Sequence, residues 1–353
     1  MTDEILFDCV GAWGVITLNR PAVLNALTLE MVAAMRAALV DLEGDADVKA
    51  VLVKGAGSRA FCAGADIRRL AAEAKDDPAG VCDFFREEYR NNAAIYHFTK
   101  PYVALIDGVA MGGGVGISVH GDFRVAGDRT LFAMPETAIG LFPDVGGGHF
   151  MPRMHDGLGL YYALTGARAN AADCMAAGVA THYAPTDKMA ELEEALYGLS
   201  FGLCPHADVE AALDCFAGDP GAAPINDKRR RIAALFLGHE RFEDLWAALE
   251  HGGGDFAAET FEILQQMSPT SLKLTFEQMK RGALLDFDDV MRMEFRMVRR
   301  VMEGHDFFEG VRAQIIDKDR APKWSPASVE KVSDKAIEKC FAPLEGEEEL
   351  ELP

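Results

Sequence analysis

Two kinds of apolar pattern alternate along the first half of the chain. Short apolar runs are typical of buried strands, whereas an apolar residue at every third or fourth position is typical of helices. A helix is predicted over residues 28–42, with Thr28 as its N-cap. Strands that recur between helices predict an α/β layered core. The strand-like runs are residues 5–10, 15–18, 50–53, 103–106, 123–126 and 131–133, with a hairpin turn at 11–14.

The pattern changes near the middle of the chain, where Ala-rich segments with helical spacing follow one another. Linkers are expected at 218–224 and 252–255, where Gly, Pro and Asp interrupt this spacing. We predict a core with the active site over 1–200, a mainly helical C-terminal region over 201–344, and a solvated, frayed acidic tail over 345–353. The predicted helices are residues 171–178, 188–197, 209–216, 232–237, 242–249, 256–267, 269–282 and 287–302.

The charge balance restricts the partners that this chain can bind. Its 353 residues include 35 Lys and Arg against 56 Asp and Glu, a formal net charge of −21. Because nucleic acid binding needs clustered positive charge, this balance argues against a nucleic acid partner. A phosphorylated ligand remains compatible, since it needs only a local basic patch. The candidates for that patch are Arg20, Arg59, Arg68 and Arg69.

Several classes of protein lack their signature in this sequence. No apolar stretch reaches the roughly 18 residues of a membrane span, so no membrane partner is expected. The seven cysteines include no CxxC pair, and residues 1–8 are unlike a secretory or transit signal, which together predict a cytoplasmic location. The nine histidines have no metal-ligand spacing, so no metal site is predicted. Ile117 stands where a dinucleotide fingerprint needs its third glycine, and no phosphate-loop motif occurs.

Two glycine-containing turns are candidates for binding a negatively charged oxygen. Residues 61–67 and 107–116 each follow a strand-like run and lead into a helix. Small residues let a backbone approach a ligand closely, and a helix N-terminus offers unpaired N–H groups. Two such turns on adjacent strands could direct two N–H donors at one oxygen, which is an oxyanion hole. The alternative is that these glycines only serve tight turns and close helix packing.

A third segment, residues 134–148, contains two carboxylates in an otherwise apolar stretch rich in Gly and Pro. These are Glu136 and Asp144. Buried carboxylates need partners or act as an acid, a base or a nucleophile. The alternative is that either residue caps a nearby helix. Composition alone leaves both interpretations open.

Together these segments resemble the enoyl-CoA hydratase/isomerase (crotonase) superfamily. The resemblance covers about residues 5–200 and implies a spiral of β-β-α units that holds a coenzyme A thioester. The motifs that carry it are Phe-Cys-Ala-Gly-Ala-Asp-Ile at 61–67, Asp-Gly-Val-Ala-Met-Gly-Gly-Gly at 107–114, Pro-Glu at 135–136 with Gly-Leu-Phe-Pro at 140–143, and Leu-Asn-Arg-Pro-Ala-Val-Leu-Asn-Ala-Leu at 18–27.

The resemblance also implies roles for particular residues. Carried over by motif, the main-chain N–H groups of Ala63 and Gly113 would form the oxyanion hole. The coenzyme A site would be lined by Ala63, Ala65 and Asp66. One departure matters: hydratases of the superfamily carry a Glu three residues after the glycine that matches Gly113, and this chain has Gly116 there.

Three further segments resemble one branch of the superfamily, the 3-hydroxyisobutyryl-CoA hydrolases. They are residues 84–90, 134–148 and 306–324, which extend the resemblance to about residue 330. This likeness implies that Glu136 and Asp144 are catalytic. It also implies that these two carboxylates contact the substrate together with Gly113 and Glu88. Glu136 could attack the thioester carbonyl or activate a water molecule, and the sequence leaves both routes open.

The expected activity is hydrolysis of a short-chain 3-hydroxyacyl-CoA thioester. The resemblance favours conversion of 3-hydroxyisobutyryl-CoA to 3-hydroxyisobutyrate and coenzyme A, in valine degradation. It implies no cofactor, since coenzyme A is part of the substrate. The alternatives are an enoyl-CoA isomerase or hydratase on the same scaffold, and a non-catalytic acyl-CoA-binding protein. A homo-oligomer is compatible with the resemblance, although the helical C-terminal region could cover the same surface within one chain.

Overall fold

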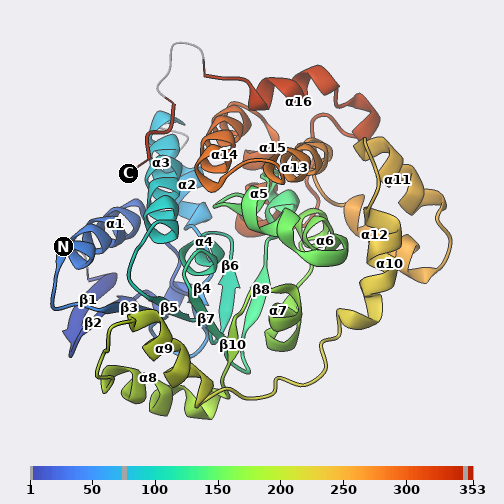
Figure 1. Cartoon of the computed structure of the whole chain (residues 1–353). Helices are drawn as coiled ribbons and strands as arrows, with labels where there is room; N and C mark the ends of the chain where they lie inside the picture. Colours follow the sequence, from blue (N-terminus) through green and yellow to red (C-terminus); the bar gives the residue numbers. More distant parts are fainter. Residues whose placement is uncertain (1–2, 74–77, 345–348, 353) are drawn as a thin grey trace.

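We describe the protein from a computed structural model, which covers residues 3–73, 78–344 and 349–352 (Figure 1). Its larger sheet has six strands in the order β1-β2-β3-β5-β7-β10, of which only the β1–β2 pair is antiparallel. Val10 pairs with Trp13, so the hairpin turn is shorter than predicted and consists of Gly11 and Ala12. The strands are Ile5–Val10, Trp13–Leu18, Ala50–Gly55, Tyr102–Leu105, Phe123–Ala126 and His182–Tyr183.

A second sheet of four strands, β4-β6-β8-β9, runs beside the first. After β3, the chain contributes strands alternately to the two sheets as it passes through β4, β5, β6, β7 and β8. Helices α2 and α3 follow β3 and β4 in the chain, and α4 follows β5 and β6. This arrangement confirms the predicted α/β fold and its spiral of β-β-α units. The strands of the second sheet are Ala60–Cys62, Val109–Met111, Leu131–Ala133 and Ala169–Asn170.

Most predicted helices are present, and their local signals explain where they begin. The Thr28 side chain accepts a hydrogen bond from the Met31 N–H and caps α1 as predicted. Helices α13 and α14 have the predicted bounds, but the long helix α3 had not been predicted as an element. The helices are α1 Leu29–Gly44, α2 Ile67–Glu73, α3 Pro78–Tyr96, α4 Gly113–Val119, α5 Gly147–Phe150, α6 Leu158–Thr165, α7 Ala171–Ala177, α8 Met189–Tyr197, α9 Pro205–Asp214, α10 Asn226–Phe236, α11 Phe242–His251, α12 Asp255–Leu264, α13 Pro269–Gly282, α14 Phe287–Met302, α15 Asp306–Val311 and α16 Asp334–Phe341.

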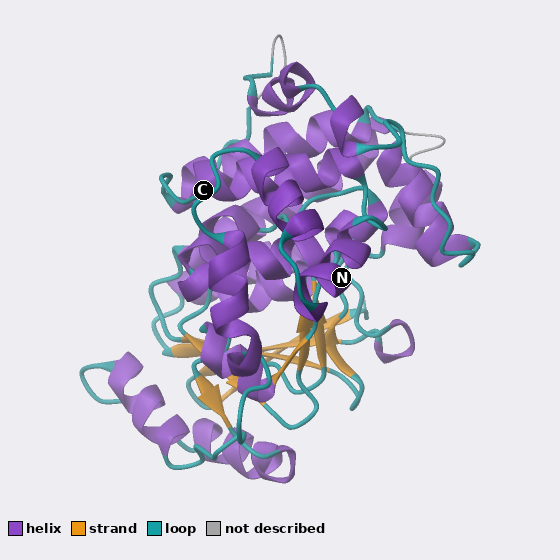
Figure 2. Ribbon diagram, turned by 90° about the vertical axis from the view of Figure 1, so that its right-hand side faces the viewer, coloured by secondary structure: helices purple, strands orange, loops and turns teal. Residues whose placement is uncertain are grey.

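The two sides of the larger sheet are covered differently. Helices α8 and α9 pack on one side, where Leu192 and Val209 join a small core with Trp13 (Figure 1). The remaining C-terminal helices lie on the other side of the strands, as Figure 2 also shows. There a single apolar core extends from Ile5 to Leu350. The predicted division at residue 200 stays a prediction, although α9 lies beyond it and packs with α8.

The described part of the acidic tail differs from the predicted frayed segment. Leu350 is buried, and the Glu349 carboxylate forms an ion pair with Arg296 of α14 at 2.9 Å. The Arg90 side chain donates to the Glu351 carbonyl. Residues 349–352 therefore pack against α3 and α14, because an apolar side chain and an ion pair fix them. The remainder of the predicted tail, residues 345–348 and 353, lies outside the described residues.

Candidate active site

The two glycine turns meet at the ends of neighbouring parallel strands. β4 pairs with β6, so the turns that follow them lie side by side. Gly64 has φ +94° and Gly112 has φ +48°, a region of backbone conformation that favours glycine. A Cβ atom at Gly64 would lie 2.8 Å from the Met111 carbonyl oxygen and 3.2 Å from the Gly113 nitrogen. The two turns can therefore approach this closely because glycine has no side chain.

The structure changes one of the two predicted oxyanion donors. The Ala63 N–H donates to the Leu24 carbonyl at 3.0 Å, so it is already engaged and the prediction for Ala63 is corrected. Among the described residues, the Ala65 N–H has no such acceptor. The Ala65 nitrogen lies 3.4 Å from the position that a Cβ atom would take at Gly113. Gly113 is the first residue of α4, so its N–H has no partner within the helix. The pair of donors that fits this geometry is Ala65 and Gly113.

The segment before α1 holds the first turn in place. The Leu27 N–H donates to the Gly64 carbonyl at 2.8 Å, and the Asp66 N–H donates to the Leu27 carbonyl at 2.9 Å. The buried Asn25 amide donates to the carbonyls of Ala60 and Phe61, at 3.0 and 3.2 Å. These bonds flank Ala65 on both sides, which gives the 18–27 motif a structural role in orienting the Ala65 N–H.

A cavity of about 580 Å³ opens beside the two turns. Its lining combines apolar side chains with a few polar groups, the usual composition of a small-molecule site. Gln314 and Ile315 of a π-helical turn (Arg312–Ile316) form part of its wall and come from the C-terminal region. All residues predicted for the site line this one cavity: Ala63, Ala65, Asp66, Glu88, Gly113, Glu136 and Asp144.

Three buried carboxyl groups face the cavity from different elements. Glu136 begins a short 3-10 turn, η2 (Glu136–Ile139), Asp144 lies in the loop after it, and Glu88 projects from α3. Their exposed fractions are only 5%, 4% and 1%. Glu136 Oε1 lies 3.0 Å from where a Cβ atom would stand at Gly112, and a Cβ atom at Gly113 would collide with Glu88 Oε1. Both side chains therefore lie directly against the second glycine turn.

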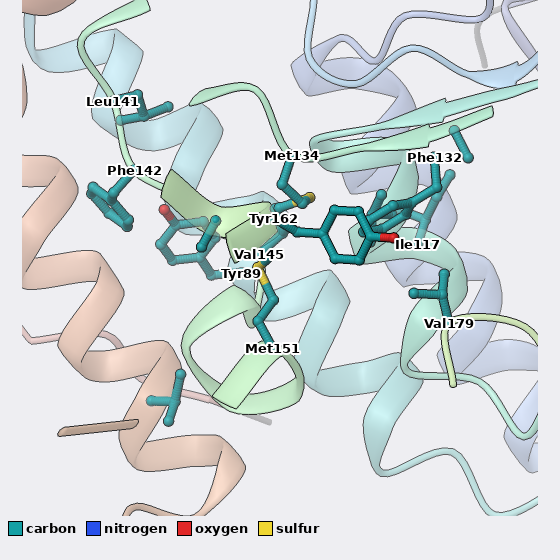
Figure 3. Close-up of a cluster of buried hydrophobic side chains, with 14 of the residues drawn as sticks. Tyr89, Ile117, Phe132, Met134, Leu141, Phe142, Val145, Met151, Tyr162 and Val179 are labelled. Atoms are coloured by element: carbon teal, nitrogen blue, oxygen red, sulfur yellow. The ribbon is translucent and has the colours of Figure 1, made fainter. Parts of the chain in front are cut away.

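The hydrogen bonding of these carboxyls is incomplete. Asp144 Oδ2 accepts a 2.9 Å hydrogen bond from the hydroxyl of Tyr89, whose ring packs among the buried side chains in Figure 3. Glu136 Oε2 and Glu88 Oε1 are buried and have no hydrogen-bond partner among the described residues. Unpaired buried polar atoms are costly, and in native proteins they cluster at functional positions. Here they point to a ligand that supplies the missing partner.

Burial raises the pKa values of all three groups, and repulsion from neighbouring carboxylates adds to the shifts of Glu136 and Glu88. Burial raises the pKa of Glu136 well above its usual range, and the Asp144 charge raises it further. The pKa of Glu88 is raised by burial and then by the charges of Asp144 and Glu136. Burial raises the pKa of Asp144 to about 7, against the opposing effect of the Tyr89 hydrogen bond. A pKa near 7 at Asp144 suits proton transfer.

A fourth buried carboxyl, Glu294, had been missed by the sequence analysis. It lies on α14 and is fully buried, and burial raises its pKa to about 8. Its oxygens accept hydrogen bonds from the N–H groups of Gly146 and Gly148, both at 2.8 Å. A signal was present in the sequence, because Glu294 is the one charged residue on the helix face formed with Val290, Met297 and Val298.

The four candidate phosphate-binding arginines are not equivalent. Arg20 forms ion pairs with Glu4 and Asp66, and Arg69 forms ion pairs with Glu30 and Glu73. Arg68 lines the cavity and donates to the carbonyl of Ile315 at 2.8 Å, with no carboxylate partner among the described residues. Arg59 does not line the cavity. The geometry therefore favours Arg68 as a cation available to an anionic ligand.

The close packing around Gly116 explains why this chain lacks the second glutamate that hydratases of the superfamily carry at this position. It is buried in α4, where a Cβ atom would lie 2.6 Å from Val145 Cβ and 2.8 Å from the Asn92 amide nitrogen. Distances this short require the neighbouring atoms to move. The position therefore has no room for a glutamate side chain unless the loop that carries Asp144 shifts.

The remaining predictions concern metal ligands, membrane-spanning helices, cofactors and oligomers. Within the described ranges, no set of three or more His, Cys, Asp or Glu side chains could hold a metal ion. His120 Nε2 donates a hydrogen bond to the Val145 carbonyl oxygen at 2.7 Å, and burial lowers the pKa of His120 to about 3. A helix long and apolar enough to cross a membrane is not found in the described part of the chain. The predictions of no cofactor and of a possible homo-oligomer stay predictions.

The fold and the cavity define a class of protein, and comparison with known families identifies it. Residues 13–341 match the family model described as enoyl-CoA hydratase/isomerase. The chain therefore belongs to the enoyl-CoA hydratase/isomerase family, as the sequence motifs predicted.

Individual relatives narrow the comparison. The chain is 47% identical to a protein of Danio rerio named 3-hydroxyisobutyryl-CoA hydrolase, mitochondrial, over 99% of this chain and 92% of the relative. It is 46% identical to the Rattus norvegicus protein of the same name, over 97% and 90% of the two chains. A solved structure titled carnitinyl-CoA dehydratase, from Mycobacterium thermoresistibile, is 39% identical and superposes with a TM-score of 0.91 over 99% of both chains. A Rhodobacter sphaeroides structure titled enoyl-CoA hydratase is 37% identical, with a TM-score of 0.88 over 97% of this chain and 98% of that one.

These relatives contradict the predicted cytoplasmic location. The hydrolases similar to this chain are named mitochondrial proteins, so that prediction is wrong. The signals behind it were weak for a physical reason. Free cysteines report that a compartment is reducing, but they do not distinguish one reducing compartment from another.

Proposed function

We propose that this chain hydrolyses the thioester of 3-hydroxyisobutyryl-CoA and releases 3-hydroxyisobutyrate and coenzyme A, a step of valine degradation. Relatives that are 44–47% identical over nearly the whole chain carry the name of this activity. The observation that supports it most strongly is a buried carboxylate, Glu136, one oxygen of which has no hydrogen-bond partner among the described residues and which shares a cavity with the N–H groups of Ala65 and Gly113.

The two N–H groups would bind the carbonyl oxygen of the thioester. As a nucleophile adds to the carbonyl carbon, that oxygen becomes an anion, and the donors of Ala65 and Gly113 would stabilise it more than the neutral carbonyl. Each donor of this kind typically contributes about 10²–10³-fold in rate. The partial positive charge at the start of α4 would act in the same direction.

Glu136 would make the new bond by one of two routes. In the first, its carboxylate adds to the carbonyl carbon, the C–S bond breaks, and a mixed anhydride forms that water then opens to free acid and carboxylate. In the second, Glu136 takes a proton from a water molecule as that water adds to the carbonyl. Both routes end with the acid and the thiol of coenzyme A, and both require Glu136 in its ionised form.

The other two carboxyls would handle protons and the 3-hydroxyl group. A protonated Asp144 would donate its proton to the departing thiolate, a role that suits a pKa of about 7. Glu88 would bind the 3-hydroxyl of the acyl group through its unpartnered oxygen. Asp66, Ala63 and Ala65 would line the path of coenzyme A, with Arg68 near its phosphates.

Hydration on the same scaffold is the main competing function, since solved relatives are titled dehydratase and hydratase. Addition of water across a C=C bond in this family uses two glutamates, and position 116 has no space for the second. Isomerisation with Glu136 alone and simple acyl-CoA binding are the remaining alternatives.

A panel of acyl-CoA substrates distinguishes these functions in one experiment. Free thiol release and absorbance of the C=C bond are followed in parallel on 3-hydroxyisobutyryl-CoA, 3-hydroxypropionyl-CoA and a short enoyl-CoA. We expect thiol release from the hydroxyacyl substrates and no change in the C=C bond. A change in the double bond without thiol release would support hydration or isomerisation, and no reaction at all would support a binding protein.

A further inference from the structure

The loop that carries Asp144 has a backbone conformation that needs support. Val145 has φ +50° and Gly146 has φ +83°. A positive φ is unfavourable for a β-branched residue such as valine, because its side chain collides with its own backbone. Val145 is nevertheless fully buried, and its side chain packs in the cluster of Figure 3. Contacts elsewhere in the protein must therefore hold this conformation.

Two side chains of the C-terminal region provide those contacts. Glu294 on α14 accepts from the Gly146 N–H with Oε2 and from the Gly148 N–H with Oε1, both at 2.8 Å. Gln278 on α13 donates to the Pro143 carbonyl at 2.7 Å and to Glu294 Oε1 at 2.9 Å. The two residues thus bind the loop on both sides of Asp144.

The geometry requires a carboxylate at position 294. Three N–H groups point at its two oxygens, so both oxygens must accept, which an ionised carboxylate does best. The side chain is fully buried, and no Lys, Arg or His forms an ion pair with it among the described residues. A Cβ atom at Gly148 would come within 3.0 Å of Oε1, so the loop backbone and the carboxylate are in close contact.

We propose that Glu294 is a positioning residue for Asp144: it fixes the loop from outside the cavity and adds a negative charge behind it. The inference rests on the proposed thioester hydrolysis. The titratable groups that face Asp144 are Glu88 and Tyr89 from α3, Glu136 from η2, and Glu294 from α14. Glu294 also repels the ionised form of Glu136, and this repulsion raises the Glu136 pKa.

Two substitutions change this site in different ways. Glu294→Gln keeps the length, removes the charge and replaces one accepting oxygen by an NH2 group, whereas Glu294→Asp keeps the charge and both acceptors but shortens the reach. Both should lower kcat, by about 10²-fold for a misplacement near 1 Å, with little change in KM. Only Glu294→Gln should move the acidic limb of the pH–kcat profile to lower pH, because it alone relieves repulsion on Glu136. The control is Glu303→Gln, the exposed C-cap of the same helix, which should leave kcat and the profile unchanged.

A folded Glu294→Gln variant with wild-type kcat and an unshifted profile would overturn the proposal, and so would a loss of thermal stability alone. If Glu294→Gln does not fold, Gln278→Met removes the Pro143 and Glu294 bonds at similar volume, and it should lower kcat in the same direction. If wild-type protein hydrolyses no acyl-CoA, the proposed function fails separately. The inference is then tested by the ¹³C-carboxyl titration of Glu136, whose midpoint should fall in Glu294→Gln because the repulsion from Glu294 is removed; an unchanged midpoint would contradict it.

Discussion

The two walls of the cavity are built in different ways. One wall consists of main-chain N–H groups in two short glycine motifs, and Ala65 and Gly113 are held there by bonds within neighbouring turns. The other wall consists of carboxyl side chains that come from α3, η2 and the loop after η2, and Glu294 of α14 supports that loop from outside the cavity. The backbone N–H groups do not titrate, whereas the charge of each carboxyl depends on pH and on a pKa that burial has raised.

This difference separates what a local motif determines from what the whole fold determines. The wall of main-chain N–H groups, here called the glycine wall, depends on glycines at the two turns. A substitution there therefore acts through geometry. The carboxyl wall needs a shared low-dielectric environment, so a substitution there changes the protonation of its neighbours. Variants in the two walls should therefore differ in their pH dependence as well as in their rates.

The largest effect is expected for Glu136→Gln. An amide cannot attack the thioester or accept a proton from water, so kcat should fall by about 10³-fold or more. KM should change little, because the amide has nearly the same volume. Thiol release from 3-hydroxyisobutyryl-CoA under saturating substrate measures this directly. Near-normal turnover would mean that Glu136 does not make the new bond.

In the glycine wall, Gly64→Ala should lower kcat by about 10²–10³-fold, the usual effect of losing an oxyanion donor. A Cβ atom there would be strained at φ +94° and would push against the Met111 carbonyl. The pH profile should keep its shape, since no carboxyl changes. Gly44→Ala is the matched control, because Gly44 ends α1 with open space around it. Equal activity of the two variants would argue against a role of the glycine turns in stabilising the oxyanion.

Asp144→Asn should lower kcat by about 10²-fold, the scale of general acid catalysis. It should also shift the acidic limb of the pH profile to lower pH, because the Asp144 charge raises the Glu136 pKa. Glu303→Gln again serves as the control. A profile that keeps its acidic limb unshifted would show that the two carboxyls do not interact.

The same variant has a predicted effect on stability. The folded-state pKa of Asp144, about 7, exceeds its unfolded value near 3.8, so the native protein loses stability as pH rises between them. Asp144→Asn should therefore unfold with a larger free energy than wild type at pH 8, by at most about 4 kcal/mol. The difference should shrink to less than about 1 kcal/mol near pH 4, close to the unfolded-state pKa. Urea denaturation at both pH values measures it, and an equal difference at both would contradict the assignment.

The smallest effect is expected for Arg68→Ala, which should raise KM about fivefold and leave kcat unchanged, the scale of one exposed ion pair with a phosphate. Arg69→Ala is the matched control, since Arg69 is already engaged by Glu30 and Glu73. Steady-state kinetics on one acyl-CoA distinguishes them. Equal KM values for the two variants would remove Arg68 from the coenzyme A site.

The sequence predicted a part of each wall. Helices α13 and α14, strands β7 and β8, and the joint placement of Glu136 and Asp144 followed from periodicity and motif. The donor at Ala63 did not, because two alanines flank Gly64 and only the hydrogen bond to Leu24 shows which one is engaged. Glu294 did not either, since its partners lie about 150 residues away in the chain and only the tertiary fold brings them together.

The central claim is that a thioester carbonyl binds between two main-chain amides and against one carboxylate. A crystal structure with a non-hydrolysable ketone analogue of 3-hydroxyisobutyryl-CoA tests it most directly. We expect the analogue's carbonyl oxygen about 2.7–3.1 Å from the nitrogens of both Ala65 and Gly113, with Glu136 next to the carbonyl carbon. An oxygen that contacts neither amide, or an acyl group bound away from Glu136, would contradict the account.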